Sequence, residues 1–156
     1  ISVPGHTEGT VEHIGFRSTL IRKFDSTPIT IPNYIFAEAP ILNYTNRNYR
    51  RINWTIGLEY NSTLVQIKEL TQMISSYLKD NDSFMVNDEY KSFVRIEKFN
   101  DSSIDILIIC FTSTQDWDKY LEIKEDLAVK IKDSVEKIGL SFAFPSQSIY
   151  IEKTQS

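Results

Sequence analysis

The clearest pattern along the chain is an alternation of apolar and polar positions that begins at residue 52. A period of two residues predicts a β-strand with one buried face. That face is predicted to hold Ile52, Trp54, Ile56, Leu58 and Tyr60. Apolar residues then recur at helical spacing over residues 64–79, with Ser62 as the expected N-cap. The apolar stripe of this helix comprises Leu64, Ile67, Leu70, Ile74 and Leu78.

The same reasoning extends to the second half of the chain. Residues 93–99 alternate as a second strand, with Val94 and Ile96 on its apolar face. Residues 100–103 have the composition of a hairpin turn, and residues 104–111 are apolar on both faces apart from Asp105. A long helix is predicted from about Asp116, with Gly139 at its left-handed C-cap. Its buried side is predicted to hold Leu121, Ile123, Leu127, Ile131, Val135 and Ile138. The order strand, helix, strand, strand, helix predicts the βαββα part of a ferredoxin-like sandwich, with residues 141–144 as a candidate further strand.

The first third of the chain has a different pattern. Residues 9–33 hold short runs of β-branched and aromatic residues separated by turn residues, which predicts a strongly bent antiparallel sheet. Gly15 stands where a strand would bulge or bend, and Asp25 with Ser26 forms a predicted turn. Pro28 and Pro32 confine the last strand to an edge or to strand ends. Residues 34–43 are expected to form a brief turn or helical stub and then a strand.

Composition narrows the class of protein. A hydrophobic content of 41% with 24% charged residues is ordinary for a folded chain, and the net charge of −4 gives no reason to expect nucleic acid as a partner. The longest apolar run, residues 106–111, is too short for a bilayer, which needs about 20 residues. No signal peptide is apparent, and the chain is expected to be a piece of a longer protein. Cys110, inside the most apolar strand, is expected to be buried and inert.

The residues that carry chemistry form no recognisable site. His6, His13 and Cys110 do not have zinc-site spacing, no glycine-rich phosphate loop occurs, and no nucleophile elbow surrounds a serine. An acidic loop contains Asp80, Asp82, Asp88 and Glu89. Because it has neither the glycine nor the spacing of an EF-hand, it is interpreted as a solvent-exposed loop rather than as a calcium site. We therefore expect no catalytic residue, no cofactor and no metal site, and the chain is not expected to be an enzyme.

One segment resembles a known family. Residues 9–33 resemble the β domain of the MscS-type small-conductance mechanosensitive channels. The matching positions are Gly9, Val11, Arg17, Ser18, Thr19, Arg22, Asp25, Pro32 and Asn33. Residues 50–60 resemble the start of that family's α/β domain, residues 139–145 its end, and residues 147–153 its terminal strand. The chain departs from the family pattern at Tyr34, where a small residue is usual, and it lacks the membrane helices and the first part of the β domain.

The resemblance implies a fold, a function and partners. The fold would be α+β, with a partial Sm-like small β domain in residues 1–45, a ferredoxin-like α/β domain in residues 46–145 and a C-terminal barrel strand in residues 146–156. The function would be that of a cytoplasmic cage, or vestibule, of a tension-gated channel that releases ions and small osmolytes on hypo-osmotic shock. The full-length protein would be a homoheptamer at the cytoplasmic face of the bacterial inner membrane, held there by helices absent from this chain.

The arginines of residues 43–51 have two interpretations. Arg47, Arg50 and Arg51 form either a solvated hinge between domains or, as the resemblance implies, charge beside the side portals of a vestibule. A second function remains open at this stage: a soluble Sm-like or ferredoxin-like module that binds RNA or a small regulatory ligand. RNA binding would need a basic surface with aromatic residues, and the β segment offers few such side chains. These are Arg17, Arg22, Lys23 and Phe24.

Overall fold

The computed structural model describes residues 1–145, which form two compact units. The first, Ile1–Arg47, is called the β unit, and the second, which begins at Asn48, is called the α/β unit. The strand predicted near the end of the chain, within residues 146–156, lies outside the described residues.

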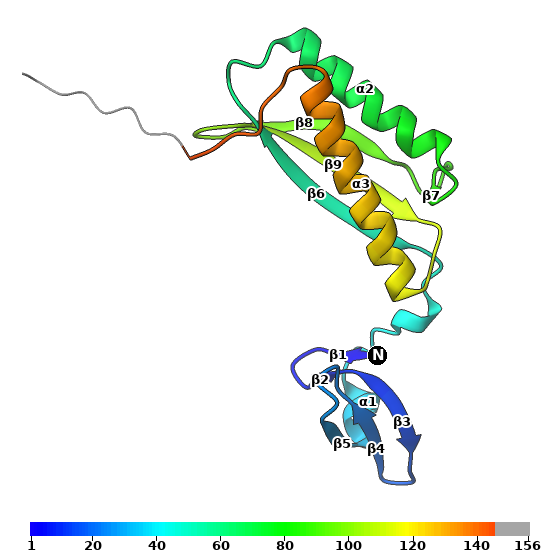
Figure 1. The fold of residues 1–156 in the computed structure, drawn as a ribbon. Coiled ribbons are helices and arrows are strands. Elements are labelled where there is room, and N and C mark those ends of the chain that lie inside the picture. Colours follow the sequence, from blue (N-terminus) through cyan, green and yellow to red (C-terminus); the bar gives the residue numbers. More distant parts are fainter. Residues whose placement is uncertain (146–156) are drawn as a thin grey trace, which may run out of the picture. The chain divides into compact units, whose positions relative to one another are not determined.

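The β unit is built on a three-stranded antiparallel sheet. Strands β3 (Thr10–Ile14), β4 (Ser18–Arg22) and β5 (Pro28–Pro32) follow one another in that order, so β5 lies on an edge, as its two prolines predict (Figure 1). A small hairpin of β1 (Ser2–Val3) and β2 (Thr7–Glu8) precedes the sheet. The central strand β4 holds the most deeply buried side chain of the unit, Ile21.

The turns of the sheet differ in one respect from the sequence-based expectation. The register between β3 and β4 shifts between Val11 and His13, so the bulge lies at Glu12 and not at Gly15. Gly15 instead lies in the β3–β4 turn, where a Cβ atom would be 2.8 Å from the Ser18 carbonyl oxygen. The glycine therefore ends the strand and allows a tight turn rather than bending the strand. The second predicted turn is confirmed, and its residue Ser26 has a φ of 67°.

The chain leaves the sheet through a short helix. Helix α1 (Asn33–Glu38) is the predicted helical stub, and a single turn of 3₁₀ helix, η1 (Tyr44–Asn46), follows it. The strand expected between them is reduced to one backbone pair, in which the N–H groups of Ser2 and Leu42 each donate to the other residue's carbonyl at 2.9 Å. Pro40 accounts for this difference, because proline has no backbone N–H group to donate and so cannot extend the strand pairing.

The α/β unit contains a second antiparallel sheet. Strand β9 (Ile104–Thr112) lies in the middle, with β6 (Arg50–Leu58) along one side and β8 (Phe93–Phe99) along the other. The two-residue strand β7 (Phe84–Met85) continues the β8 side against the end of β9. Strands β6 and β8 therefore run parallel with β9 inserted between them, which is the split arrangement of ferredoxin-like folds.

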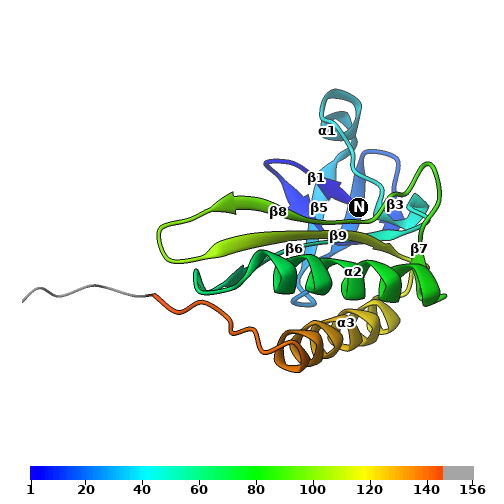
Figure 2. The same ribbon diagram turned by 90° about the horizontal axis from the view of Figure 1, so that it is seen from above.

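Both long helices lie on one face of this sheet. Helices α2 (Leu64–Asp80) and α3 (Trp117–Lys137) run side by side beneath β6, β8 and β9 (Figure 2). The element order βαββα and the α+β class predicted from the sequence are confirmed. After α3, the N–H groups of Gly139 and Leu140 donate to the carbonyls of Glu136 and Val135, which is the Schellman pattern expected for the left-handed Gly139.

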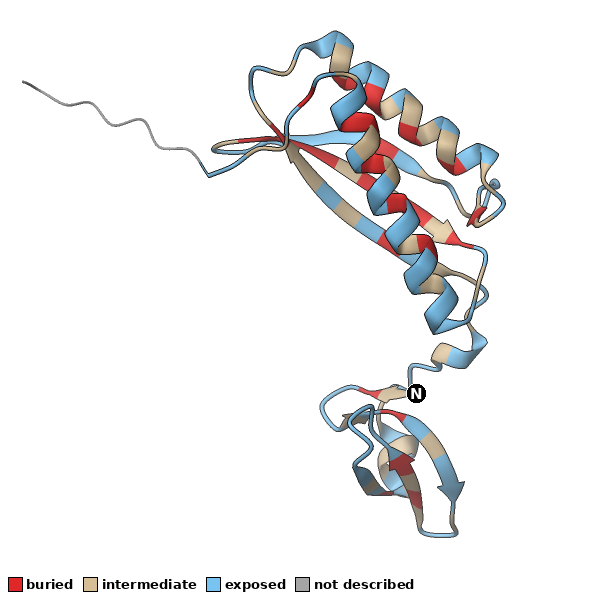
Figure 3. Cartoon of the chain, in the orientation of Figure 1, coloured by how far each residue is buried: buried red, intermediate tan, exposed pale blue. Residues whose placement is uncertain are grey.

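The helix-covered face of the sheet forms the main core of the protein. Figure 3 shows the buried residues distributed over α2, α3 and the strands that these helices cover. The buried side chains of this core include Ile52, Leu58, Ile67, Leu70, Ile74, Leu78, Ile106, Ile108, Leu127, Ile131 and Val135. The predicted apolar faces of β6, α2 and α3 are thus confirmed in their central positions.

Four predicted core positions and one predicted helix cap are corrected. Leu64, the first residue of α2, is 68% exposed and lies outside the buried stripe of that helix. Tyr60 lies beyond the end of β6 and is 51% exposed. Leu121 is 42% exposed, because Tyr120 and Ile123 occupy the sheet-facing side of the first turns of α3. Ile96 on edge strand β8 is 40% exposed and immediately precedes a shift in register. The N-cap of α2 is Thr63, not Ser62.

The start of α2 explains the last correction. The Thr63 side chain accepts from the N–H of Gln66, and the Gln66 side chain accepts from the N–H of Thr63, which together make a capping box. Gln66 also donates to the Ile138 carbonyl at the end of α3, at 2.9 Å. The same side chain therefore fixes one helix start and joins it to the end of the neighbouring helix.

The candidate strand of residues 141–144 and the lone cysteine complete the unit. Phe142 forms a single bridge with Leu58, on the free side of β6, so only the start of a fourth strand is present among the described residues. Cys110 is fully buried in β9, and this burial raises the pKa of its thiol to about 12. The expectation of a buried, unreactive thiol is thus supported, because the thiolate is the reactive form.

Candidate functional site

The side chain of Asn33 holds the β3–β4 hairpin in place. Its amide nitrogen donates to the carbonyls of Gly15 at 2.9 Å and Phe16 at 3.2 Å, and its amide oxygen accepts from the Thr19 hydroxyl at 2.8 Å. Its backbone N–H also donates to the Arg17 carbonyl at 2.9 Å. All four groups belong to the hairpin, so one residue at the start of α1 connects the helix to the turn. Thr19 and Asn33, two of the family-like positions, therefore act as a pair.

At Gly9, just before β3, the backbone lies very close to strand β4. A Cβ atom at this position would lie 2.3 Å from the carbonyl oxygen of Arg22 and 2.9 Å from a side-chain carbon of Ile21. No residue with a side chain fits there without moving the backbone of β4. Val11, two residues later, pairs directly with Ile21 across the sheet.

The charged positions of the motif stabilise the β4–β5 turn. Arg22 donates to both carboxylate oxygens of Glu12 on the neighbouring strand and, at 2.8 Å, to the Ser26 carbonyl in the turn. The hydrogen bond from Arg22 lowers the pKa of Glu12 below its ordinary value, and the same bond raises the pKa of Arg22. Asp25 accepts from the N–H of Thr27 at 2.9 Å, and this bond lowers the pKa of the Asp25 carboxyl group. Glu12 was missed by the sequence analysis, because only the pairing register places it beside Arg22.

The remaining motif residues define the ends of the strands. Ser18 pairs with Pro32 at the last register position between β4 and β5. Arg17, by contrast, is tied to Asn33 only through its backbone, and its side chain is exposed. The motif therefore shapes a hairpin and a turn, and among the described residues it does not converge on a pocket that could hold a ligand.

The β unit buries little of its own apolar surface. Its large buried side chains are Val3, Ile21 and Ile31. Its exposed apolar side chains include Ile14 at 72%, Phe16 at 97%, Phe24 at 78% and Tyr34 at 63%. A folded segment of this length with so small a core usually needs a partner, and exposed apolar groups of this kind mark protein contacts. Strands β3 and β5 also form the two outer edges of the sheet, where further strands can pair.

The three arginines predicted as a group lie in different surroundings. Arg47, at the end of the β unit, places its guanidinium 4.6 Å from the centre of the Tyr44 ring. Arg50, the first residue of β6, donates to the Gln115 carbonyl at 3.0 Å, and its guanidinium lies 5.0 Å from the centre of the Trp117 ring. Each of these two cations is therefore held against an aromatic ring.

Arg51 differs from the other two because it points to the opposite side of β6. It pairs with Phe111 of β9, on the face of the sheet that the helices leave uncovered, and its side chain is exposed. Of the three, Arg51 is thus the cation that the fold presents to solvent.

The described part of the chain contains no group of three or more metal-ligating side chains. None of its helices is both long enough and apolar enough to span a bilayer. The features that the fold does present are an open β unit and a ferredoxin-like unit joined by an arginine-containing segment.

These features correspond to two known domains. Residues 1–46 match the family model described as "Mechanosensitive ion channel, beta-domain", and residues 52–142 match the one described as "Mechanosensitive ion channel MscS, C-terminal". The class is therefore that of mechanosensitive ion channels. The chain belongs to the MscS family of these channels, which confirms the resemblance identified in the sequence. Because this is a family of membrane channels, its membership also agrees with the expectation that the chain is not an enzyme, and it favours the channel over a soluble RNA-binding or ligand-binding module.

Relatives with curated names support the same assignment. The chain is 44% identical over 145 residues to an MscS family protein of Aquifex aeolicus, covering 93% of this chain and 39% of that protein. It is 35% identical to the low conductance mechanosensitive channel YnaI of Escherichia coli, covering 93% of this chain and 41% of that protein. The chain thus spans about two fifths of the length of these relatives.

Solved structures show the same fold. The closed state of Helicobacter pylori MscS superimposes with a TM-score of 0.77 at 23% identity, covering 96% of this chain and 56% of that one. Arabidopsis thaliana MSL1 superimposes with a TM-score of 0.80 at 20% identity, covering 90% of this chain and 50% of that one.

Proposed function

We propose that this chain is the cytoplasmic cage of a tension-gated channel in the bacterial inner membrane. Seven copies assemble through their β units, with residues 1–45 as the β domain and residues 46–145 as the α/β wall of a vestibule. Ions and small osmolytes pass through this vestibule when hypo-osmotic shock opens a pore formed by membrane helices elsewhere in the same protein.

The open β unit is the observation that carries this proposal. Two outer strands and several exposed aromatic side chains remain beside a core of Val3, Ile21 and Ile31. A ring of identical copies closes such edges, because each copy offers one edge to each of its neighbours. The match of residues 1–46 to the channel β-domain supports the same interpretation.

The assembly and the gating can be tested on the full-length channel that carries this chain. Native mass spectrometry of the detergent-purified protein is expected to give the mass of seven subunits, and suction applied to membrane patches is expected to open it. The control is the same patch without suction. A monomeric mass, or currents that ignore membrane tension, would contradict the proposal.

The exposed arginine gives a second prediction. We propose that Arg51 lies near the portals of the vestibule and favours anions there, because a fixed cation raises the local anion concentration. Replacing Arg47, Arg50 and Arg51 together with glutamine is expected to shift the reversal potential under a KCl gradient towards cation preference. Arg51→Gln alone is expected to reproduce most of that shift.

Arg50→Gln serves as the matched control for this measurement. The Arg50 guanidinium is held by Gln115 and Trp117, so its loss is expected to change protein stability more than permeation. An unchanged reversal potential in the triple variant would show that these arginines do not filter ions.

A further inference from the structure

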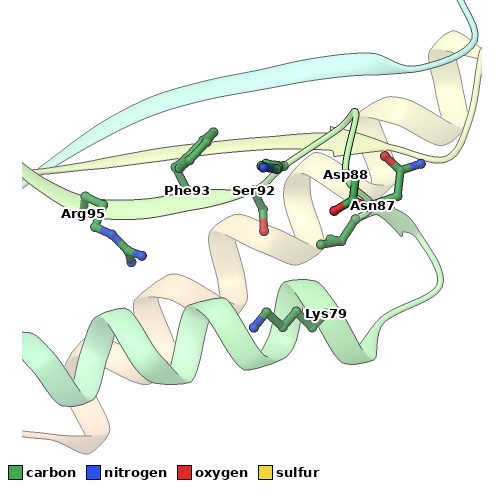
Figure 4. Close-up of a pocket in the computed structure, with 8 residues that line it drawn as sticks. Lys79, Asn87, Asp88, Ser92, Phe93 and Arg95 are labelled. Atoms are coloured by element: carbon green, nitrogen blue, oxygen red, sulfur yellow. The ribbon is translucent and has the colours of Figure 1, made fainter.

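A hollow lies between helix α2 and the edge strand β8 of the α/β unit. It has a volume of about 600 Å³, and Figure 4 shows the side chains that line it. A smaller hollow of about 260 Å³ adjoins it along α2, and the two share Lys79, Ser92 and Arg95. We call the pair of hollows the α2–β8 groove. These residues come from separate elements, so only folding brings them together.

The shared part of the groove is rich in groups that donate hydrogen bonds. Lys79 extends from α2 and Arg95 from β8, and the Ser92 side chain points towards α2 (Figure 4). Arg95 uses one guanidinium nitrogen to donate to the Val94 carbonyl at 2.9 Å, which fixes the orientation of the rest of the group. The smaller hollow adds the Ser75 hydroxyl, whereas the Thr71 hydroxyl, which also lines it, already donates to the Lys68 carbonyl at 2.9 Å. Two cations with neighbouring hydroxyls suit a doubly charged anion with several acceptor oxygens, as a phosphate has.

The groove is locally positive, although the chain as a whole is negatively charged. The larger hollow is lined by three cations, Lys79, Lys91 and Arg95, and by one acid, Asp88, while the chain carries a net charge of −4. A locally positive hollow on an acidic protein attracts anions selectively.

The apolar lining residue Phe93 does not extend this cationic part of the groove. Phe93 is 45% exposed, and its side chain points away from α2 and from Lys79 (Figure 4). The groove therefore recognises the charged group of a ligand rather than an organic ring.

We propose that the α2–β8 groove binds small anions that carry a phosphate group, with the phosphate held by Lys79 and Arg95. The site is formed by the α/β unit alone, so the proposal does not depend on assembly of the channel.

Adenosine monophosphate, inorganic phosphate and adenosine are suitable probes. In ¹⁵N NMR titrations of the chain at constant ionic strength, adenosine monophosphate is expected to shift the amide signals of Lys79, Ser92 and Phe93 with a saturating curve. Inorganic phosphate is expected to bind with an affinity within about threefold of that of adenosine monophosphate, and adenosine is expected to bind at least about tenfold more weakly, because only the phosphate group contacts the two cations. Equal affinity for adenosine and adenosine monophosphate would overturn the proposal, as would shifts spread evenly over the surface lysines.

Substitutions then test the two cations. Lys79→Gln and Arg95→Gln are each expected to weaken adenosine monophosphate binding about tenfold, the effect of losing one charge-assisted hydrogen bond. Arg95→Lys, which keeps the charge, is expected to retain most of the affinity. Lys68→Gln, an exposed lysine elsewhere on α2, removes the same charge and is expected to leave binding unchanged. Binding that is insensitive to Lys79 and Arg95, or equally sensitive to Lys68, would refute the site.

Discussion

Replacing Gly9 with alanine is expected to unfold the β unit in a large fraction of molecules while the α/β unit stays folded. The added methyl group would lie 2.3 Å from the Arg22 carbonyl oxygen, and the neighbouring atoms are backbone that cannot rotate away. Separating β4 from the chain at Gly9 disturbs the small core around Ile21. We expect a loss of about 3 kcal/mol, which is a large part of the stability of so small a unit.

The two units can be measured separately in the same sample. Both tryptophans, Trp54 and Trp117, belong to the α/β unit, so their fluorescence reports on that unit alone. Amide hydrogen exchange along β4 reports on the β unit and is expected to become roughly a hundredfold faster in the variant. Unchanged exchange in β4, or an equal loss in the α/β unit, would contradict this account.

Gly5→Ala is the matched control for the first prediction. Gly5 has a φ of +80°, so alanine there costs about 1 kcal/mol of backbone strain, but no atom lies within 4 Å of the added methyl group. Gly9 does not have a positive φ, so this strain is absent there, and any loss in Gly9→Ala beyond that in Gly5→Ala is a lower limit on the cost of the steric contact.

Replacing Asn33 with alanine is expected to release the β3–β4 hairpin from α1. The change removes two donated hydrogen bonds, to Gly15 and Phe16, and leaves the buried Thr19 hydroxyl without its acceptor. Leaving buried polar groups unsatisfied costs about 1–3 kcal/mol, so the hairpin is expected to lose roughly 2 kcal/mol. Faster amide exchange at Ser18 and Thr19, with unchanged tryptophan fluorescence, is the expected measurement.

A double-mutant cycle sharpens this second prediction. Thr19→Val should cost clearly less in the Asn33→Ala background than in the unsubstituted chain, because the two side chains share one hydrogen bond. Additive effects would show that the pair is not coupled. Asn46→Ala, which changes an exposed asparagine of η1, is expected to alter neither unit.

The α/β unit could be predicted almost completely from the sequence. Its strands and helices each bury one face, so the periods of two and of about 3.6 residues appear directly in the order of apolar residues. The two-residue strand β7 was not predicted, and Ile96 inside β8 was wrongly expected to be buried. Other errors fall at the ends of elements. Thr63 rather than Ser62 caps α2, and Tyr60 lies beyond β6, because the hydrophobic period carries no information on where an element stops.

The β unit was predictable mainly through its resemblance to a family. Its strands are short and its core is small, so periodicity alone indicated no more than a bent sheet. The family-like motif identified residues that stabilise the hairpin and the turn of this unit, but it did not show which contacts each of them makes. Glu12, for example, became visible only when the bulge in β3 placed it beside Arg22.

By itself, then, the sequence determined the helices and strands, the fold class and the family. Helices and strands follow from the periodic spacing of apolar residues, and the family follows from a motif within a short segment, so both can be recognised from residues close together in the chain. Only the tertiary structure decided which distant side chains meet. Asn33 reaches back to a turn at residues 15 and 16, Arg50 contacts Gln115, and Lys79 and Arg95 line one groove. These contacts depend on how strands pair and helices pack, and that arrangement is set by burial of the whole core rather than by any local pattern.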